Sequence, residues 1–421
     1  MTRPIVYDAT HLVSLGRASG AAGIGRLDLA FARHFAAHPR LDCGAHYGMR
    51  GPHVLAPSRL ARIVADVAPA TRDDAAEWMR LRGWLLGVAD DLSPTTRERP
   101  RGALSELLWR MPLRLANDAP RRLAPSSLYL NIAQHACEFP ALFRWLARRP
   151  DMRAVFFMHD LLPLDRPEFF RPGYGRLFQR RIDTILRHAH ALLTTSHVVA
   201  ERLAQEIARQ GASGGARIPI HVEPPPSTLE QPGETAHDDA LARCDYFVLL
   251  STLEPRKNHL MLLNVWRALA AGPQPAPKLV LVGGRGWENE QIVDTLRRGE
   301  TIRPCVRWAG DLATADLRRL IANANALLMP SFAEGYGLPV VEALSLGTPA
   351  IVSDIPVFRE VAQERAVFLS PIDGLGWKRA ITDFVPAQSP RRLAAIRAAQ
   401  SFEAPNWPRY FERVETFLDS L

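Results

Sequence analysis

Short, continuous apolar runs alternate with helix-periodic segments through the second half of the chain. The runs include YFVLLST at 246–252, KLVLVGG at 278–284 and ALLMPS at 326–331, and helical stretches such as HLMLLNVWRALAA lie between them. A strand that is apolar at every position is buried on both faces, which is typical of a parallel sheet covered by helices. The pattern therefore predicts a doubly wound α/β domain.

The first half repeats this pattern less regularly. PIVYD at 4–8 opens as a strand, and a glycine-rich loop and the helical stretch LDLAFARHFAAH follow it. SLYLNIAQH at 127–135, AVFFMHD at 154–160 and ALLTTS at 191–196 predict further buried strands. Residues 52–125, rich in Arg and Pro, fit no single element. A second doubly wound domain is the simplest interpretation of this half.

The domain boundaries follow from composition. Residues 223–240 contain several prolines and almost no apolar side chains, so we expect an inter-domain linker there. An N-terminal domain is then predicted at 1–222 and a C-terminal domain at 241–400. Residues 401–421 end in an amphipathic helix. We expect two Rossmann-like domains facing a central cleft, with the chemistry in loops at the carboxyl ends of the strands.

Composition excludes several classes of protein. The chain is 47% hydrophobic and 23% charged, which is ordinary for a globular protein. No apolar run approaches the ~18 residues of a membrane span, and Asp8 and His11 interrupt the one candidate leader, so a cytoplasmic protein is expected. The four cysteines are scattered without a CxxC pair, which predicts free thiols and argues against a zinc site or disulfides.

Charge is distributed unevenly along the chain. Residues 1–220 hold 31 Arg against 20 Asp plus Glu, an excess of 11, whereas residues 221–421 hold 21 Lys plus Arg against 24 Asp plus Glu, a deficit of 3. The arginines are dispersed and no aromatic–basic module accompanies them, so we do not expect nucleic-acid binding. A solvated basic surface and a membrane-facing one are both compatible with this excess.

The stretch SFAEGYGLPVVEALSLGTPAIVSD at 331–354 predicts an anion site. Gly335 and Gly337 allow close approach to the backbone, and Pro339 suits the first turn of a helix. The free N–H groups of that helix start would cradle a phosphate. Glu334 and Glu342 could accept hydrogen bonds from sugar hydroxyls. Alternatively, they are a loop charge and a complement to the helix dipole.

A second loop supplies positive charge. Arg256 and Lys257 follow the apolar run at 246–252, and both could bind an anion in the same crevice. The alternative is a solvated pair of cations. A helix start is an unfavourable place for such a pair unless an anion is bound.

The first half offers weaker candidates. His159 and Asp160 end one predicted strand, and Asn131 and His135 lie near the end of another. His159 could orient a sugar, donate to a developing charge or be a structural histidine. Gly25 closes GAAGIG, which lacks the spacing of a dinucleotide fingerprint and fits either a phosphate or sugar loop or a flexible turn. LVLVGGRGW at 279–287 could bring backbone to the cleft or be a structural turn.

Together these segments resemble the retaining GT-B glycosyltransferases of family 4. The resemblance is carried by STLEPRKNH, LVLVGGRGW, VRWAGDL and PSFAEGYGLPVVEALSLGTPAIVSD, in which Glu334 and Glu342 match the family's E-x7-E pattern. GIGR at 23–26 and FFMHDLLPLDRPEFF resemble the subgroup that builds bacterial surface polysaccharides. Two departures are VEPPPS at 222–227, where the family often has a proline–leucine–glycine turn, and Tyr336, where Phe is frequent.

The resemblance implies roles for the loop residues. Glu342 would bind ribose hydroxyls, and Glu334 would face the transferred sugar. Arg256 and Lys257 would hold the diphosphate and stabilise it as the leaving group without a metal. The backbone of Gly335, Tyr336, Gly337 and Leu338 would assist.

The resemblance also implies roles in the first half. His159 would lie near the reacting sugar, and Gly25 would approach the donor. Asp160, His135 and Asn131 are candidate acceptor contacts. The last helix would cross back onto the N-terminal domain. No metal and no cofactor are expected, because the nucleotide-sugar is a substrate.

The implied function is the retaining transfer of a sugar, with mannose or rhamnose favoured, from a nucleotide-diphosphate sugar. The acceptor would be a glycan or a lipid-linked oligosaccharide in O-antigen (lipopolysaccharide), capsule or exopolysaccharide synthesis. Such an enzyme would be cytoplasmic, with transient contact at the inner face of the bacterial membrane. The alternatives are a nucleotide-sugar epimerase on the same fold and a non-catalytic nucleotide-sugar-binding homologue.

Overall fold

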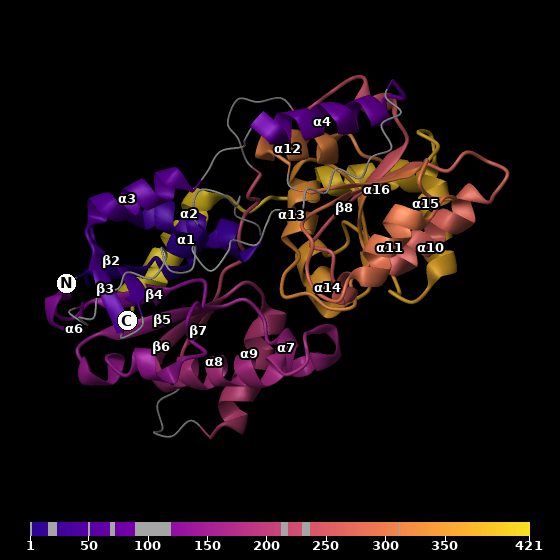
Figure 1. Cartoon of the computed structure of the whole chain (residues 1–421). Helices are drawn as coiled ribbons and strands as arrows, with labels where there is room; N and C mark the ends of the chain where they lie inside the picture. Colours follow the sequence, from indigo (N-terminus) through magenta and orange to yellow (C-terminus); the bar gives the residue numbers. More distant parts are fainter. Residues whose placement is uncertain are drawn as a thin grey trace. The chain divides into compact units, whose positions relative to one another are not determined.

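A computed structural model describes residues 2–15, 23–48, 51–67, 72–88, 119–211, 218–229, 236–310 and 312–421. The chain forms two compact units (Figure 1). Unit 1 comprises Met1–Ala68, Glu98–Pro225 and Asn406–Leu421. Unit 2 comprises Pro69–Arg97 and Pro226–Pro405.

Unit 1 is built on a seven-stranded sheet of order β3-β2-β1-β4-β5-β6-β7, in which only β3 runs antiparallel. Buried strands appear where the apolar runs predicted them, at β1, β4, β5 and β6. Helices pack on the sheet and close two apolar clusters with it. The strands are β1 Ile5–Asp8, β2 Leu41–Gly48, β3 Gly51–Leu55, β4 Leu128–Asn131, β5 Arg153–Met158, β6 Ala189–Thr194 and β7 Ile220–Val222. The described α-helices are α1 Thr10–Leu15, α2 Ile24–Ala36, α3 Pro57–Asp66, α6 Ala119–Arg122, α7 Leu162–Asp165, α8 Tyr174–His188, α9 His197–Arg209 and α17 Trp407–Asp419.

Unit 2 has a six-stranded, wholly parallel sheet of order β10-β9-β8-β11-β12-β13, with one apolar cluster on each face. The two sheets confirm the predicted doubly wound α/β class. The strands are β8 Tyr246–Leu250, β9 Lys278–Val282, β10 Val306–Ala309, β11 Ala326–Met329, β12 Ala350–Ser353 and β13 Val367–Leu369. The described α-helices are α4 Arg72–Leu85, α10 His259–Ala270, α11 Glu290–Arg298, α12 Thr314–Ala322, α13 Leu338–Ser345, α14 Pro356–Ala362, α15 Gly374–Phe384 and α16 Pro390–Gln400.

The last helix, α17, lies in the core of unit 1. Tyr410, Val414 and Leu418 share its buried face, at the spacing that made the segment amphipathic. The ring of Phe31 on α2 meets the rings of Tyr410 and Phe411 edge to face, with centroids 5.8 and 5.3 Å apart. Aromatic pairs in this arrangement add to the stabilisation that apolar burial supplies.

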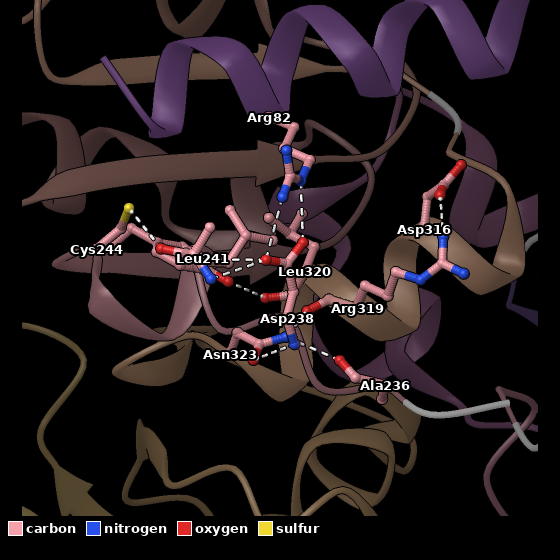
Figure 2. A network of polar contacts seen from close by, with 11 residues as sticks. Arg82, Ala236, Asp238, Leu241, Cys244, Asp316, Arg319, Leu320 and Asn323 are labelled. Carbon is pink, nitrogen blue, oxygen red and sulfur yellow. Dashed lines mark hydrogen bonds and ion pairs between the residues drawn. The ribbon is translucent and has the colours of Figure 1, made fainter. Parts of the chain in front are cut away.

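Helix α4 comes from the first half of the sequence but packs in unit 2. Trp84 is buried, and the cations of Lys278 and Arg307 lie 5.0 and 4.7 Å from its ring centroid. Arg82 binds both oxygens of Asp238, at 2.9 and 3.2 Å (Figure 2). The boundary drawn at residue 222 assigned this helix to the N-terminal domain. The grouping of α4 with unit 2 corrects it, because the helix completes an apolar cluster of that unit.

Three further expectations bear on the described residues. The four cysteines are free thiols, as predicted. Over the described ranges, no three His, Cys, Asp or Glu side chains are grouped as metal ligands would be. Nor does any described helix have the length and hydropathy that crossing a bilayer requires.

Candidate functional site

Two loops of unit 2 are held together at the carboxyl ends of β8 and β11, which are neighbours in the sheet. The backbone N–H of Phe332 donates to the carbonyl of Arg256 at 2.9 Å. Asn258, buried and in the left-handed region at φ 59°, donates through Nδ2 to the carbonyls of Pro330 and Pro371, at 3.0 and 2.8 Å. These bonds fix the loop that carries the two predicted cations against the loop that carries Glu334.

The two loops bring four charged side chains into contact. Arg256 Nη1 lies 2.7 Å from Glu334 Oε2, and Lys257 Nζ lies 2.6 Å from Glu334 Oε1. The other guanidinium nitrogen, Arg256 Nη2, lies 2.6 Å from Glu254 Oε1. The sequence did not predict a role for Glu254, although this residue lies in STLEPRKNH, two positions before Arg256.

Burial makes the electrostatics of this cluster strong. Burial alone would raise the pKa of the Glu334 carboxyl, but Lys257 and Arg256 outweigh it and lower that pKa to about 2. Burial also lowers the pKa of Lys257, and the charge of Arg256 adds to this effect. The pKa of Glu254 is raised because desolvation exceeds the attraction of Arg256. Glu334 is therefore ionised at any physiological pH.

The start of α13 depends on one glycine. Gly337 has φ +100°, and a Cβ there would lie 2.6 Å from Cε1 of Phe358. The helix begins at Leu338 with Pro339 in its first turn, as predicted. Pro339 has no N–H, and the N–H of Val340 donates to the carbonyl of Gly337 at 2.8 Å. The start of α13 therefore offers an anion chiefly the positive end of the helix dipole.

Glu342 lies in the second turn of α13 and is 2% exposed. Thr228 Oγ1 donates to its Oε1 at 2.7 Å. Thr228 lies in the predicted linker, directly after VEPPPS, the segment that departs from the family's usual turn. The structure brings the residue after this segment onto Glu342 across 114 positions of sequence, a separation that no local pattern reveals.

The glycines of LVLVGGRGW serve loop packing. A Cβ on Gly283 would lie 2.2 Å from the carbonyl oxygen of Ser251, and one on Gly286 would lie 2.7 Å from that of Leu253. Their absence of side chains lets this turn pack against residues 251–254, directly before Arg256. Asn289 Nδ2 also donates to Leu253 O, at 3.0 Å. Of the two interpretations of this segment, these contacts favour the structural turn.

In unit 1, His159 follows β5 and its Nε2 lies 2.8 Å from the carbonyl oxygen of Ile132. Since a carbonyl only accepts, Nε2 carries the hydrogen and Nδ1 the lone pair. Burial lowers the pKa of His159 to about 4. The ring is therefore neutral at pH 7, and Nδ1 is suited to accept a hydrogen bond rather than to donate one. Asp160 Oδ1 accepts from the backbone N–H of Leu162 at 3.0 Å.

Asn131 belongs to a buried network of hydrogen bonds. Its Nδ2 donates to Asp8 Oδ2 at 2.7 Å, and its Oδ1 accepts from the N–H of Gln134 at 2.8 Å. Tyr129 donates its hydroxyl to the same oxygen of Asp8 at 2.5 Å. Asn131 is 1% exposed, so these contacts orient the ends of β1 and β4.

His135 lies at the surface, with its ring centroid 6.1 Å from that of His11. His11 Nδ1 in turn lies 2.8 Å from Oδ2 of the buried Asp28, whose Oδ1 accepts from Tyr7 OH at 2.5 Å. Sequence reasoning missed the link between His11 and Asp28, because the two residues lie on different helices.

Gly25 is buried in the first turn of α2. Gly23 precedes that helix at φ 50°, a conformation that favours glycine. Gly16 and Gly20 lie outside the described residues. The structure therefore accounts for Gly23 as the start of a helix, and the role of Gly25 stays a prediction.

Comparisons with known proteins agree on a family and a fold. Residues 242–400 match the family described as "Glycosyl transferases group 1". The serotype-specific mannosyltransferase WbdA of Escherichia coli is 33% identical over 281 residues, which cover 64% of this chain and 33% of that protein. The chain thus spans about a third of the length of this relative.

Solved structures extend the likeness beyond that segment. Sucrose-phosphate synthase from Thermosynechococcus elongatus has a TM-score of 0.58 at 14% identity, covering 99% of this chain and 98% of its own. Anabaena HepE in complex with UDP-glucose has a TM-score of 0.51 at 19% identity, covering 70% and 79%. These likenesses confirm the predicted GT-B fold class.

Proposed function

We propose that this chain, whose residues 242–400 match the glycosyl transferases group 1 family, is a retaining, metal-independent glycosyltransferase that uses a nucleotide-diphosphate sugar. The observation that carries the proposal is the pair of largely buried cations, Arg256 and Lys257, both held by Glu334 in the loop that leads into α13. Two cations and the positive end of a helix dipole together suit a diphosphate. HepE, whose structure holds UDP-glucose, supports a donor of this kind.

Each side chain of the site then has a task. Arg256 and Lys257 bind the diphosphate and stabilise the charge that grows on it as the bond to the anomeric carbon breaks. Glu342, oriented by Thr228, accepts hydrogen bonds from ribose hydroxyls. Glu334 turns to the hydroxyls of the transferred sugar. The new bond forms between the anomeric carbon and the acceptor oxygen, whose proton passes to the leaving diphosphate.

Unit 1 would contribute the acceptor side. The Nδ1 lone pair of His159 would accept from a sugar hydroxyl, while Asp160 and His135 remain candidate acceptor contacts. Asn131 would act by holding the ends of β1 and β4 in place. Gly25 stays a proposed backbone contact to the donor.

The transferred sugar is proposed to be mannose or a related hexose, because the relative WbdA is a mannosyltransferase. The acceptor would be a glycan or lipid-linked oligosaccharide of a bacterial surface polysaccharide, O antigen above all. Such an acceptor would lie at the inner face of the membrane. There the Arg-rich residues 1–220 would make transient contact with anionic lipid.

The test is Glu342→Ala, measured by calorimetry with UDP, GDP, ADP and dTDP after a thermal-shift screen has identified the base. Loss of a charge-assisted hydrogen bond of about 1.5–3 kcal/mol predicts roughly 10- to 100-fold weaker binding. Glu364→Ala, at an exposed position of the same unit, is the control and should bind as the wild type does. Unchanged affinity in Glu342→Ala would refute the assignment, and donor isomerisation without an acceptor would indicate an epimerase.

A further inference from the structure

We propose that Glu334 is an internal anion that occupies the diphosphate's cation ligands until the donor binds and displaces it. The inference rests on the proposed function, since it takes Arg256 and Lys257 as those ligands. It assigns Glu334 a role in the unliganded protein in addition to its proposed contact with the transferred sugar.

The geometry of Glu334 resembles that of a bound phosphate. Its two carboxylate oxygens are shared between the two cations, with Oε2 2.7 Å from Arg256 Nη1 and Oε1 2.6 Å from Lys257 Nζ. Two oxygens of a phosphate would be shared between the same donors in the same manner. The carbonyl of Ala333 also accepts from Arg256 Nη1, at 2.6 Å, which keeps the guanidinium directed at this loop.

The charges of the cluster are balanced before any ligand arrives. Arg256 and Lys257 carry two positive charges, and Glu254 and Glu334 carry two negative charges. The side chains of Arg256 and Lys257 are 13% exposed and that of Glu334 is 6% exposed, so solvent and salt screen them little. A diphosphate that enters this cluster must therefore compete with a carboxylate for each cation.

Protonation cannot release Glu334, because the two cations hold its pKa at about 2. The carboxylate must instead move, by rotation of its side chain, when the diphosphate takes its place. The moving group then carries its negative charge away from the phosphates. This movement makes it available to the sugar hydroxyls.

Glu254 offers a matched comparison within the same cluster. It carries the same charge and is also buried, with a side chain 3% exposed. It contacts Nη2 of Arg256 at 2.6 Å, whereas Lys257 donates to Glu334. Glu254 is therefore a brace for Arg256, and Glu334 is the residue that spans both cations.

The test measures the binding of inorganic pyrophosphate by calorimetry. Glu334→Gln keeps the shape of the side chain and removes its charge, so the dissociation constant should fall about tenfold. Glu254→Gln should change it less than threefold. A double variant, Lys257→Ala with Glu334→Gln, should lose the gain. Equal or weaker binding by Glu334→Gln, an equal gain in Glu254→Gln, or a gain that persists in the double variant would each overturn the inference.

If Glu334→Gln does not fold, a structure of the wild-type protein with bound nucleoside diphosphate tests the same displacement of Glu334. Separation of Glu334 Oε1 from Lys257 Nζ beyond hydrogen-bond range supports the exchange, and retention of that contact contradicts it. Pyrophosphate has neither ribose nor sugar, so its binding is independent of Glu342. A failed Glu342→Ala test beside a gain in Glu334→Gln would reject the proposed enzyme and keep the anion exchange.

Discussion

The glycine that begins α13 gives a sharp test of how backbone geometry supports the anion site. Gly337 combines φ +100° with a close contact, because an added Cβ would lie 2.6 Å from Phe358 Cε1. Phe358 is 0% exposed and belongs to an apolar cluster of unit 2. Gly347, just past the other end of the helix, has φ +73°, and its added Cβ would meet only Gln400 Cγ, at an ordinary 3.7 Å.

The two positions separate backbone strain from steric overlap. An L-residue in the left-handed region costs about 1–2 kcal/mol. Forcing a methyl group into a packed aromatic ring adds roughly 1–3 kcal/mol. Gly347→Ala should therefore lower the free energy of unfolding by about 1–2 kcal/mol, and Gly337→Ala by about 2–5 kcal/mol.

The assay is urea unfolding of wild type and both variants, with hydrogen exchange to assign the loss to unit 2, since a two-unit chain need not unfold in one step. Nucleoside-diphosphate binding is measured on the same samples. Gly337→Ala should also weaken binding, because it displaces the start of α13 and the loop that carries Glu334, whereas Gly347→Ala should not. Equal losses of stability, or unchanged binding by Gly337→Ala, would refute the reasoning.

Four further variants, at three positions, test the packing of α4, the hydrogen bonds of the cation loop and the titration of His159. Trp84→Ala should lower the free energy of unfolding of unit 2 by about 3–5 kcal/mol. Amide exchange should then become faster in β10, while β5 in unit 1 keeps its protection. Equal loss of protection in both strands would contradict the packing of α4 in unit 2. Asn258→Gly keeps the left-handed backbone and loses the bonds to Pro330 and Pro371, so it should weaken diphosphate binding, and Asn258→Ala should do so further because it adds strain. Unchanged diphosphate binding in both Asn258 variants would show that the loop does not depend on the hydrogen bonds of this side chain. The folded-state pKa of His159, about 4, lies below the unfolded value of about 6.5, so the folded state binds fewer protons and stability falls as pH drops from about 6.5 to about 4. His159→Gln should remove that part of the pH dependence in urea unfolding, and an unchanged slope would exclude a neutral, buried ring.

The elements that the sequence predicted well are those whose signal is local. The runs at 246–252, 278–284 and 326–331 became β8, β9 and β11, because a strand buried on both faces must be apolar at every position. The start of α13 was predicted from Pro339 and the glycines before it. The antiparallel β3 and the helix α3 were not, since residues 52–125 show no clear period.

The anion site was predictable in part. Arg256 and Lys257 could be predicted as anion ligands, because cations directly after a buried strand need a counter-charge. Their partner was not evident, and both take Glu334, 78 and 77 positions away. Glu254 was not predicted as a member of the cluster, because the sequence of a loop does not show whether its carboxylate is solvated or buried.

By itself, the sequence determined the two doubly wound sheets and the loops that carry the chemistry, because hydrophobic periodicity and turn residues act over a few positions. Only the tertiary structure decided that α4 completes unit 2, that Thr228 orients Glu342 and that Glu334 neutralises both cations. These outcomes depend on burial and on contacts between distant segments. A charge or hydroxyl acquires its partner, and its energy, only when packing removes it from water.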